Sequence, residues 1–451
     1  MDHASSSSVR ALVLVPVPTN ARANAQRRKG NGDGAASTHA PEERLSEATG
    51  LAAAIDLDVV EDAIVPLPAV RPSTLFGAGK VDELGELIGE LEIQLAVVDH
   101  ALTPIQQRNL ERAWNCKVLD RTGLILEIFG RRARTREGRL QVELAHLTFQ
   151  RSRLVRSWTH LERQRGGFGF LGGPGETQIE TDRRLLQERI QKIRTELAKV
   201  TRTRALHRKG RQLVPYPVIA IVGYTNAGKS SLFNRLTGSK VLAKDQVFAT
   251  LDPTMRELVL ESGRRVILSD TVGFISDLPT MLVAAFRATL EEVIEADLIL
   301  HVRDISHPES EAQCVDVENV LRDLLPDADG GKRNSLEVWN KVDQLTAEER
   351  ALIETKAGKT EPAPILLSAL TGEGCDRLIA VVDEWIGRDD VEMTLSIPHT
   401  DGRLLSWLYE NARVVSRDTS ENGDVTARIR IANDKVGRLE GQLKASGVVG
   451  G

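Results

Sequence analysis

The chain has little cysteine, few aromatic residues and no long hydrophobic run. Its 451 residues include only three cysteines, Cys116, Cys314 and Cys375, which are far apart and form no C-x-x-C pair. A disulfide framework or a cysteine metal site is therefore not expected, which suits a reducing compartment. No apolar stretch approaches the ~18 residues that a membrane span requires, and the apolar run 11–15 is too short for a signal peptide. We expect a cytoplasmic protein without a membrane span.

Positive charge is concentrated in one segment, although the net charge of the chain is only −5. Residues 131–211 contain 21 Lys and Arg but only 8 Asp and Glu, a local charge of +13, which leaves −18 for the rest. The hydrophobic content of 41% and the charged content of 27% are ordinary for a globular protein. The asymmetry indicates a nucleic-acid contact on one part of the chain.

Residues 223–230 match the pattern G-x-x-x-x-G-K-[ST] at every fixed position. The apolar run 217–222 predicts a buried strand before them, and apolar residues at helical spacing in 231–236 predict a helix after them. Such a loop directs backbone N–H groups at phosphates, while Lys229 adds positive charge and the Ser230 hydroxyl can hold Mg²⁺. The predicted phosphate-binding residues are Gly223, Tyr224, Thr225, Asn226, Ala227, Gly228, Lys229 and Ser230.

Three later motifs have the spacing of a P-loop GTPase, and each follows a predicted strand, at 264–268, 336–339 and 364–367. In the first motif an Asp can hold Mg²⁺ through water and a glycine N–H can meet the γ-phosphate. In the second an Asp can accept both guanine N1–H and N2–H₂, and the third backs the base. Ligands bind at the carboxyl ends of strands in open α/β sheets, so we predict a GTPase domain that binds GTP and GDP. The motif residues are Asp270, Thr271, Val272 and Gly273; Asn340, Lys341, Val342 and Asp343; and Ser368, Ala369 and Leu370.

Four residues bear on catalysis. Thr250 and Thr254 are both candidates to close on Mg²⁺ and the γ-phosphate when GTP is bound. Phe274 stands where many GTPases have a glutamine that orients the attacking water, so we expect slow intrinsic hydrolysis that a partner or an ion accelerates. Asn226 is a candidate K⁺ ligand, as are loop asparagines in potassium-dependent GTPases. The alternative is that Asn226 only caps the loop.

The pattern of helices and strands predicts an α/β protein in five segments. In the α/β N-terminal domain, helices are expected at 45–54, 81–91 and 104–114, and strands at 55–66, 96–99 and 117–119, in a parallel sheet. The GTPase domain should have a mixed, mostly parallel sheet with helices on both faces. The segments are an N-terminal strand with a flexible insertion (1–42, the insertion being 20–41), the α/β N-terminal domain (43–130), a basic helical hairpin (131–213), the P-loop GTPase domain (214–388) and a small α+β domain (389–451).

Two basic amphipathic stretches, 139–162 and 180–204, flank the glycine-rich segment 166–175. Their apolar stripes predict an antiparallel helical hairpin. The tip has six glycines and two phenylalanines but no charge. The arms can run along RNA phosphates while the tip enters a narrow space, offering backbone amides and stackable rings. The alternative is a plain coiled-coil spacer with a flexible tip.

These motifs resemble those of the HflX GTPases, in the Obg-HflX branch of P-loop GTPases. The resemblance runs from the N-terminal domain through the GTPase domain. The C-terminal segment is the part of the sequence that the family pattern constrains least, and the family does not require a segment like 20–41. The matching stretches are 103–111 (TPIQQRNLE), 118–123 (VLDRTG), 134–144 (RTREGRLQVEL), 172–184 (GGPGETQIETDRR), 223–230 and 248–254.

The resemblance implies that Thr250, rather than Thr254, is the switch threonine on Mg²⁺. It also implies binding to the large ribosomal subunit in the GTP form, with the glycine-rich tip near the peptidyl transferase centre, and some members of the family split stalled ribosomes. We therefore take Lys229, Thr250 and Asn226 as the predicted catalytic residues and Ser230 and Thr250 as the predicted metal ligands. The nucleotide-lining residues that the resemblance adds are Phe248, Ala249, Thr250, Leu251 and Asp252.

Three functions remain open from the sequence. The first is a ribosome-stimulated GTPase that remodels or splits stalled ribosomes under stress. The second is a potassium-activated GTPase that acts with an RNA-modification partner, and the third is an RNA-binding nucleotide sensor. The glycine-rich tip favours the ribosome-stimulated GTPase. A GTPase that acts with an RNA-modification partner would require a redox or one-carbon site, which the sequence of the flanking segments does not show. We expect a monomer whose partners are GTP or GDP and the rRNA of the large subunit.

Overall fold

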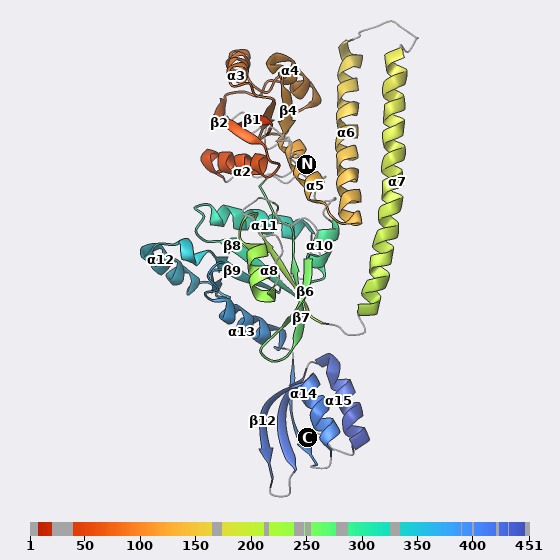
Figure 1. Ribbon diagram of the computed structural model, residues 1–451, viewed down its shortest axis with the longest axis vertical. Coiled ribbons are helices and arrows are strands. Elements are labelled where there is room, and N and C mark those ends of the chain that lie inside the picture. Colours follow the sequence, from red (N-terminus) through yellow and green to blue (C-terminus); the bar gives the residue numbers. More distant parts are fainter. Residues whose placement is uncertain are drawn as a thin grey trace, which may run out of the picture.

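The computed structural model describes residues 8–19, 39–164, 174–211, 216–238, 248, 254–276, 287–324, 334–388, 390–398, 401–420, 424–431 and 433–446. Figure 1 shows an N-terminal α/β domain, a long helical hairpin, a central α/β domain and a small C-terminal domain. The hairpin runs beside the N-terminal and central domains, and the C-terminal domain lies at the opposite end of the molecule from the N-terminal sheet. This architecture confirms the predicted fold class.

The N-terminal domain is built on a four-stranded parallel sheet. Its strands are β1 (Arg10–Pro18), β2 (Asp58–Leu67), β3 (Leu95–Val98) and β4 (Lys117–Asp120), in the order β2-β1-β3-β4. Its helices are α2 (Pro41–Ala53), α3 (Ala78–Glu90), α4 (Pro104–Trp114) and α5 (Arg121–Arg132). Residues 11–15 are fully buried because α2 and α5 cover one face of the sheet and α3 and α4 cover the other. The predicted strands and helices of this domain are confirmed.

The sequence pattern does not predict helix α5. Nearly all of its residues from Arg121 to Phe129 are buried, so the stretch has no polar face and lacks the stripe by which a surface helix is recognised. The Asp120 carboxylate accepts a hydrogen bond from the Gly123 N–H at 2.8 Å and caps the helix. This helix brings Asp120 and Arg121 to the carboxyl edge of the sheet.

The predicted flexible insertion, 20–41, lies mostly outside the described residues. Its last three residues contradict the prediction, because Pro41 begins helix α2 and His39 makes two ion pairs. Proline suits the first turn of a helix, where its missing N–H has no intrahelical partner. The predicted boundary between residues 42 and 43 therefore falls inside a helix.

Helices α6 (Arg136–Gln164) and α7 (Pro174–Arg211) form the predicted antiparallel hairpin and lie side by side in Figure 1. Ile190 and Ile193 of α7 are buried, and Arg189 of α7 pairs with Glu143 of α6 at 2.6 Å. Residues 165–173, most of the predicted glycine-rich tip, lie outside the described residues. The last two tip residues begin α7.

The central domain has a six-stranded sheet with helices on both faces. Only β6 is antiparallel to its neighbour, so the predicted mostly parallel sheet is confirmed. In order β10-β9-β8-β5-β7-β6, the strands are β10 (Ile365–Leu366), β9 (Ser335–Asn340), β8 (Leu298–Asp304), β5 (Val218–Gly223), β7 (Arg265–Asp270) and β6 (Thr254–Val259). The helices are α8 (Lys229–Thr237), α10 (Arg287–Ile294), α11 (Ser310–Leu324), η2 (Val342–Gln344), α12 (Ala347–Ala357) and α13 (Cys375–Ile386).

The two faces of the central sheet belong to different hydrophobic clusters. Helices α8 and α13 pack on one face in a cluster confined to this domain. Helices α10 and α11 pack on the other face in a cluster that continues through Tyr224 and Phe274 into α2, α5 and β1 of the N-terminal domain. The N-terminal and central domains therefore share one continuous apolar core.

The C-terminal domain has an antiparallel sheet with two helices packed against it. Buried and exposed residues alternate along the middle strand, as its sequence pattern predicts. Its elements are β11 (Val391–Ile397), α14 (Gly402–Asn411), β12 (Arg413–Thr419), β13 (Val425–Ile431) and α15 (Asn433–Ser446), with sheet order β11-β13-β12.

The three cysteines are unpaired, as predicted. Among the described residues no helix has the length and apolar character to cross a membrane. In the same part of the chain, no group of three or more His, Cys, Asp or Glu side chains is placed to hold a metal ion.

Candidate nucleotide-binding site

The two fixed glycines give the predicted phosphate loop its shape. Gly223 ends β5 with φ of 151°, and a Cβ there would lie 2.1 Å from the Val302 carbonyl oxygen. Gly228 has φ of 90°, and a Cβ there would lie 2.2 Å from the Asn340 side-chain nitrogen. A side chain fits at neither position, which is the physical reason for glycine at both.

Asn340 joins three loops of the site. It is 2% exposed, and its Nδ2 donates a hydrogen bond to the Ala227 carbonyl oxygen at 2.8 Å. Its Oδ1 accepts a hydrogen bond from the Ala369 N–H at 2.9 Å. The Asn-Lys-x-Asp motif is therefore fixed to the phosphate loop on one side and to residues 368–370 on the other.

Lys229 is buried beneath the phosphate loop. Its Nζ donates a hydrogen bond to the Tyr224 carbonyl oxygen at 2.6 Å, and a Cβ added to Gly273 would lie 2.9 Å from this nitrogen. Burial lowers the pKa of Lys229 to about 8, opposed by the carboxylate of Asp270. A bound anion would offset the burial and restore the charged ammonium.

Ser230 and Asp270 form a pair of oxygen donors beside Lys229. The Ser230 hydroxyl donates to the Asp270 carboxylate at 2.7 Å, and the Asp270 side chain is fully buried. A hydroxyl and a carboxylate at the carboxyl end of a strand and the start of a helix are the oxygen ligands that Mg²⁺ prefers. The chemistry of these donors therefore fits a magnesium ion.

The segment after Gly273 is tied to the phosphate loop through its backbone. The Thr225 N–H donates to the Phe274 carbonyl oxygen at 2.7 Å, and the Phe274 N–H donates to the Gly223 carbonyl oxygen at 3.1 Å. The Phe274 ring is 2% exposed and belongs to the apolar core shared by the two domains. The place expected for a water-orienting glutamine is thus filled by a core residue.

The predicted guanine end of the site is more open. Asp343, the middle residue of η2, and Leu370, which is 74% exposed, lie at its rim. Lys341 pairs with Asp304 at 2.7 Å, and the Arg235 guanidinium donates to the carbonyl oxygens of Ala369 and Leu370. These contacts fix the loops that would surround a base while leaving Asp343 accessible.

The structure brings the phosphate loop and the three later motifs together at the carboxyl ends of β5, β7, β9 and β10. Thr254 begins β6, where it pairs with Asp270, so this alternative switch threonine has a structural place in the sheet. Phe248 is described, and its ring meets the Phe129 ring of α5 at 4.8 Å between centroids. Ala249, Thr250, Leu251 and Asp252 lie outside the described residues.

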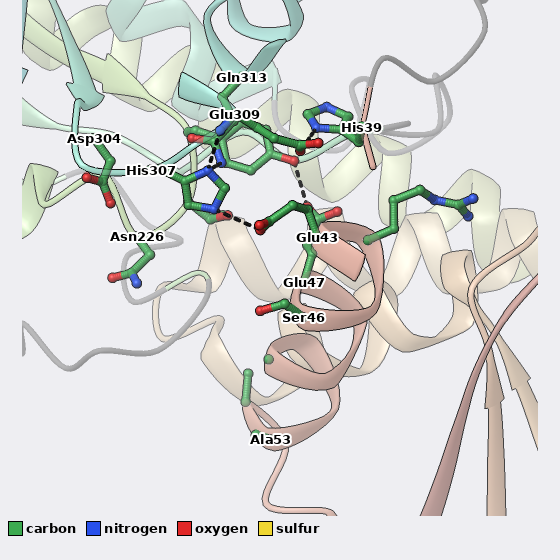
Figure 2. A pocket seen from close by; sticks show the side chains of 15 residues that line it. His39, Glu43, Ser46, Glu47, Ala53, Asn226, Asp304, His307, Glu309 and Gln313 are labelled. Carbon is green, nitrogen blue, oxygen red and sulfur yellow. Dashed lines mark hydrogen bonds and ion pairs between the residues drawn. The ribbon is translucent and has the colours of Figure 1, made fainter. Parts of the chain in front are cut away.

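A cavity of about 400 Å³ lies between α2 and the phosphate loop. Figure 2 shows Asn226 on the loop side, with Asp304 and His307 beyond it and Glu43 and Glu47 on the helix side. The His307 ring pairs with Glu43 at 3.3 Å. Asn226 has φ of 59°. Four carboxylates line the cavity, and each is paired with a basic side chain: Glu43 with His307, Glu47 with Arg121, Asp304 with Lys341 and Glu309 with His39.

His39 closes one side of this cavity. Its ring nitrogens lie 2.5 Å from a Glu309 carboxylate oxygen and 2.7 Å from an Asp316 oxygen. The hydrogen bond to Asp316 raises the pKa of His39 to about 9, against the effect of burial. Figure 2 shows the His39–Glu309 pair, which fastens the residues before α2 to the central domain.

Sequence reasoning missed a buried polar network between the two domains. The Tyr224 hydroxyl, in the phosphate loop, donates to Glu47 of α2 at 2.7 Å and accepts from the Ser276 N–H at 2.7 Å. The Ser276 hydroxyl also donates to Glu47, at 2.6 Å. The Arg121 guanidinium of α5 donates to the Ser276 carbonyl oxygen at 2.8 Å and to its hydroxyl at 2.9 Å.

Asp99 anchors this network at the end of β3. Arg121 and Arg44 donate to its two carboxylate oxygens at 2.5 and 2.6 Å. Burial alone would raise the pKa of Asp99, but the two guanidiniums hold it below its usual value. Burial also raises the pKa of Tyr224 well above its ordinary value. The only sequence signal for these residues was the stretch 118–123, which matched the HflX pattern without a role for Arg121.

Four family descriptions match consecutive parts of the chain. Residues 42–130 match "GTP-binding GTPase N-terminal", 132–211 match "GTP-binding GTPase Middle Region", 218–341 match "50S ribosome-binding GTPase" and 352–448 match "HflX C-terminal domain". The last match begins inside the central domain, in α12, ahead of the predicted boundary at 388.

Two relatives called GTPase HflX match over most of the chain. The protein from Magnetococcus marinus is 51% identical over 410 residues, 91% of this chain and 93% of its own length. The protein from Escherichia coli K12 is 43% identical over 389 residues, 86% of this chain and 90% of its own. The structure of a GTP-binding protein from Sulfolobus solfataricus in complex with GDP has a TM-score of 0.42, at 22% identity, covering 84% of this chain and 98% of that one.

Proposed function

The chain belongs to the HflX family of ribosome-binding GTPases, and we propose that the large ribosomal subunit controls its GTP hydrolysis. The observation that carries this proposal is Phe274, a buried core residue where a water-orienting glutamine is expected. A site that lacks its own means of placing water depends on a partner or an ion to complete it. The basic hairpin supplies a surface for the partner, because rRNA phosphates attract Lys and Arg side chains.

We propose that the site binds GTP with its phosphates on the loop 223–230. Lys229 neutralises the β- and γ-phosphate oxygens, and the Gly273 N–H donates to the γ-phosphate. Asp343 accepts the guanine N1–H and N2–H₂, while residues 368–370 back the base. Phe248, Ala249, Thr250, Leu251 and Asp252 line the nucleotide on the remaining side.

We propose Ser230 and Thr250 as direct Mg²⁺ ligands, with Asp270 holding the ion through water. An ion held by these residues would neutralise the negative charge of the phosphate oxygens. We also propose K⁺ as a second cofactor at Asn226, since potassium-dependent GTPases have loop asparagines of this kind. Turnover that is unchanged when sodium replaces potassium would exclude the K⁺ role.

We propose that the protein acts in the cytoplasm as a monomer, remodelling or splitting stalled ribosomes under stress. The test is the rate of GTP hydrolysis with and without purified large subunits, at fixed magnesium and potassium. Strong stimulation is expected, followed by the appearance of free subunits when intact ribosomes are incubated with the protein and GTP. A variant that lacks 166–175 should bind GTP normally and lose the stimulation.

Other outcomes of this test point to the two alternative functions. Hydrolysis that large subunits do not change, with normal GTP binding, would favour a GTPase that works with an RNA-modification partner. Ribosome binding without stimulation or splitting would favour an RNA-binding nucleotide sensor.

A further inference from the structure

Two neighbouring residues at the start of α5 hold two different parts of the molecule. The Asp120 carboxylate, 3% exposed, accepts a hydrogen bond from the Arg153 guanidinium of hairpin helix α6 at 2.6 Å. Arg121 points to the central domain and donates to Ser276 and Glu47. The hairpin and the central domain are therefore fastened to adjacent residues of one buried helix.

Asp120 is fixed on its own side as well. It accepts hydrogen bonds from the Gly123 N–H at 2.8 Å and the Leu102 N–H at 3.3 Å, so it cannot move without disturbing the first turn of α5. The Arg153 guanidinium also lies 4.3 Å from the centroid of the Phe149 ring. Arg153 lies in the second half of α6 with its side chain 19% exposed, turned toward α5 rather than presented on the exposed basic face of the hairpin.

Ser276 lies three residues beyond Gly273, the glycine placed to meet the γ-phosphate. Between them, Phe274 is bonded to the backbone of Gly223 and Thr225. The segment after Gly273 therefore follows the phosphate loop, and a shift of both toward a γ-phosphate would pull on Ser276, which Arg121 holds by two hydrogen bonds. Arg121 and Glu47 of the N-terminal domain both hydrogen-bond Ser276 and meet this displacement directly, and of the two it is Arg121 that adjoins Asp120.

This arrangement requires the shape of an arginine side chain. One guanidinium nitrogen of Arg121 meets Asp99 while the other meets Glu47 and Ser276, which a planar fork of donors allows. A lysine ammonium keeps the charge but is a single point and cannot span these acceptors. Arg121→Lys therefore tests geometry rather than charge.

We propose that the Asp120–Arg121 pair is a joint that transmits displacements between the hairpin and the segment after Gly273. Arg121 acts as a positioning residue for hydrolysis, and Arg153 connects it to the hairpin. The proposal rests on the proposed function in one respect, that the hairpin contacts the ribosome. The joint itself also predicts an effect of nucleotide on the hairpin without any ribosome, since coupling between two sites is reciprocal.

The first experiment needs no ribosome. Amide hydrogen exchange is compared for the full-length protein with GDP and with a non-hydrolysable GTP analogue. In the wild type the analogue should change protection around residues 120–124 and 149–153, and in Arg121→Lys the difference should vanish while both nucleotides still bind. Equal protection in the two wild-type complexes, or a difference that survives in Arg121→Lys, would overturn the joint.

The second experiment measures kcat and KM for GTP with and without large subunits in Arg153→Gln, with subunit binding followed by co-sedimentation. Basal kcat and subunit binding should be retained, and stimulation of kcat should fall by at least about fivefold. The control is Glu143→Gln, which breaks another 2.6 Å ion pair of α6, one whose partner Arg189 lies on α7; its stimulation should stay normal.

Full stimulation in Arg153→Gln would contradict the proposal. Loss of subunit binding would contradict it too, since Arg153 would then be an RNA contact rather than a connection to Asp120. If the wild type shows no stimulation at all, the proposed ribosomal function fails, and the hydrogen-exchange comparison alone decides whether the joint exists.

Discussion

Asn340 donates a hydrogen bond to the carbonyl oxygen of Ala227 and thereby fastens the guanine motif to the phosphate loop. Its other amide atom accepts from the Ala369 N–H, so one buried side chain serves three loops. Removing it would leave two buried backbone groups unsatisfied, and each such group costs about 1–3 kcal/mol. The loops of the site are consequently expected to loosen together.

Asn340→Ala should lower the free energy of unfolding by about 2–4 kcal/mol and weaken both GTP and GDP binding. Urea denaturation and titration with a fluorescent guanine nucleotide measure the two effects. Asn319→Ala is the matched control, because Asn319 is exposed on α11, and it should change stability by less than about 0.5 kcal/mol. Full nucleotide affinity in Asn340→Ala would show that the three loops hold their positions independently.

Gly228→Ala should abolish most nucleotide binding without unfolding the protein. Its positive φ costs a non-glycine residue about 1–3 kcal/mol, and the new methyl group would displace the Asn340 amide. GTP affinity is expected to fall at least about tenfold. Gly89→Ala in α3 is the control, since nothing lies within 4 Å of a Cβ there. A Gly228→Ala protein that binds GTP normally would mean that the loop adopts another shape around its ligand.

Proton uptake should accompany GTP binding at alkaline pH. In the nucleotide-free protein the pKa of Lys229 is lowered to about 8, below its value of 10.5 in the unfolded chain. The depressed pKa therefore opposes folding fully below about pH 8, and this cost shrinks as the pH rises from 8 to 10.5. Phosphates favour the ammonium, so GTP affinity should decline as the pH rises above 8.

Calorimetry in two buffers of different ionisation enthalpy measures this uptake. At pH 8.5 binding should take up most of a proton, and at pH 6.5 almost none through Lys229. Lys229→Arg is the control, because an arginine stays charged throughout this range. An uptake at pH 8.5 that persists in Lys229→Arg would assign the proton to another group.

Phe274→Gln should not create a faster enzyme. The ring is buried in the core shared by the two domains, so the substitution removes apolar packing and buries an amide, at about 3 kcal/mol or more. Basal kcat should stay level or fall, and the thermal unfolding midpoint should drop. Phe274→Leu, which remains apolar, should cost less stability. A rise in basal kcat at unchanged stability would mean that the side chain reaches the γ-phosphate.

The nucleotide site could be predicted largely from the sequence because its requirements are local. Gly223, Gly228 and Lys229 must follow a strand and begin a helix, and a spacing pattern records this constraint directly. The carboxyl ends of parallel strands then bring Asp270 and Asn340 to the same edge. For the same reason the alternating pattern of the N-terminal domain predicted its strands and most of its helices.

The contacts between domains could not be predicted in this way. Glu47, Arg121 and Ser276 come from three distant parts of the chain, and they meet only because α2 and α5 pack against the phosphate loop. Helix α5 was missed because its burial on all sides removes the polar stripe. Charged residues in such places look like ordinary surface residues until the packing of the domains is known.

The burial of Phe274 also bears on how long the protein stays in its GTP-bound form. The Phe274 ring is buried in a core that spans two domains. A polar side chain that could orient water at this position would disrupt that core, so substitution here cannot raise the hydrolysis rate without loss of stability. We therefore expect the GTP-bound form to persist for a long time away from the proposed partner. Under the proposed function, the GTP-bound protein would persist until it met the large ribosomal subunit, and that encounter would end the cycle.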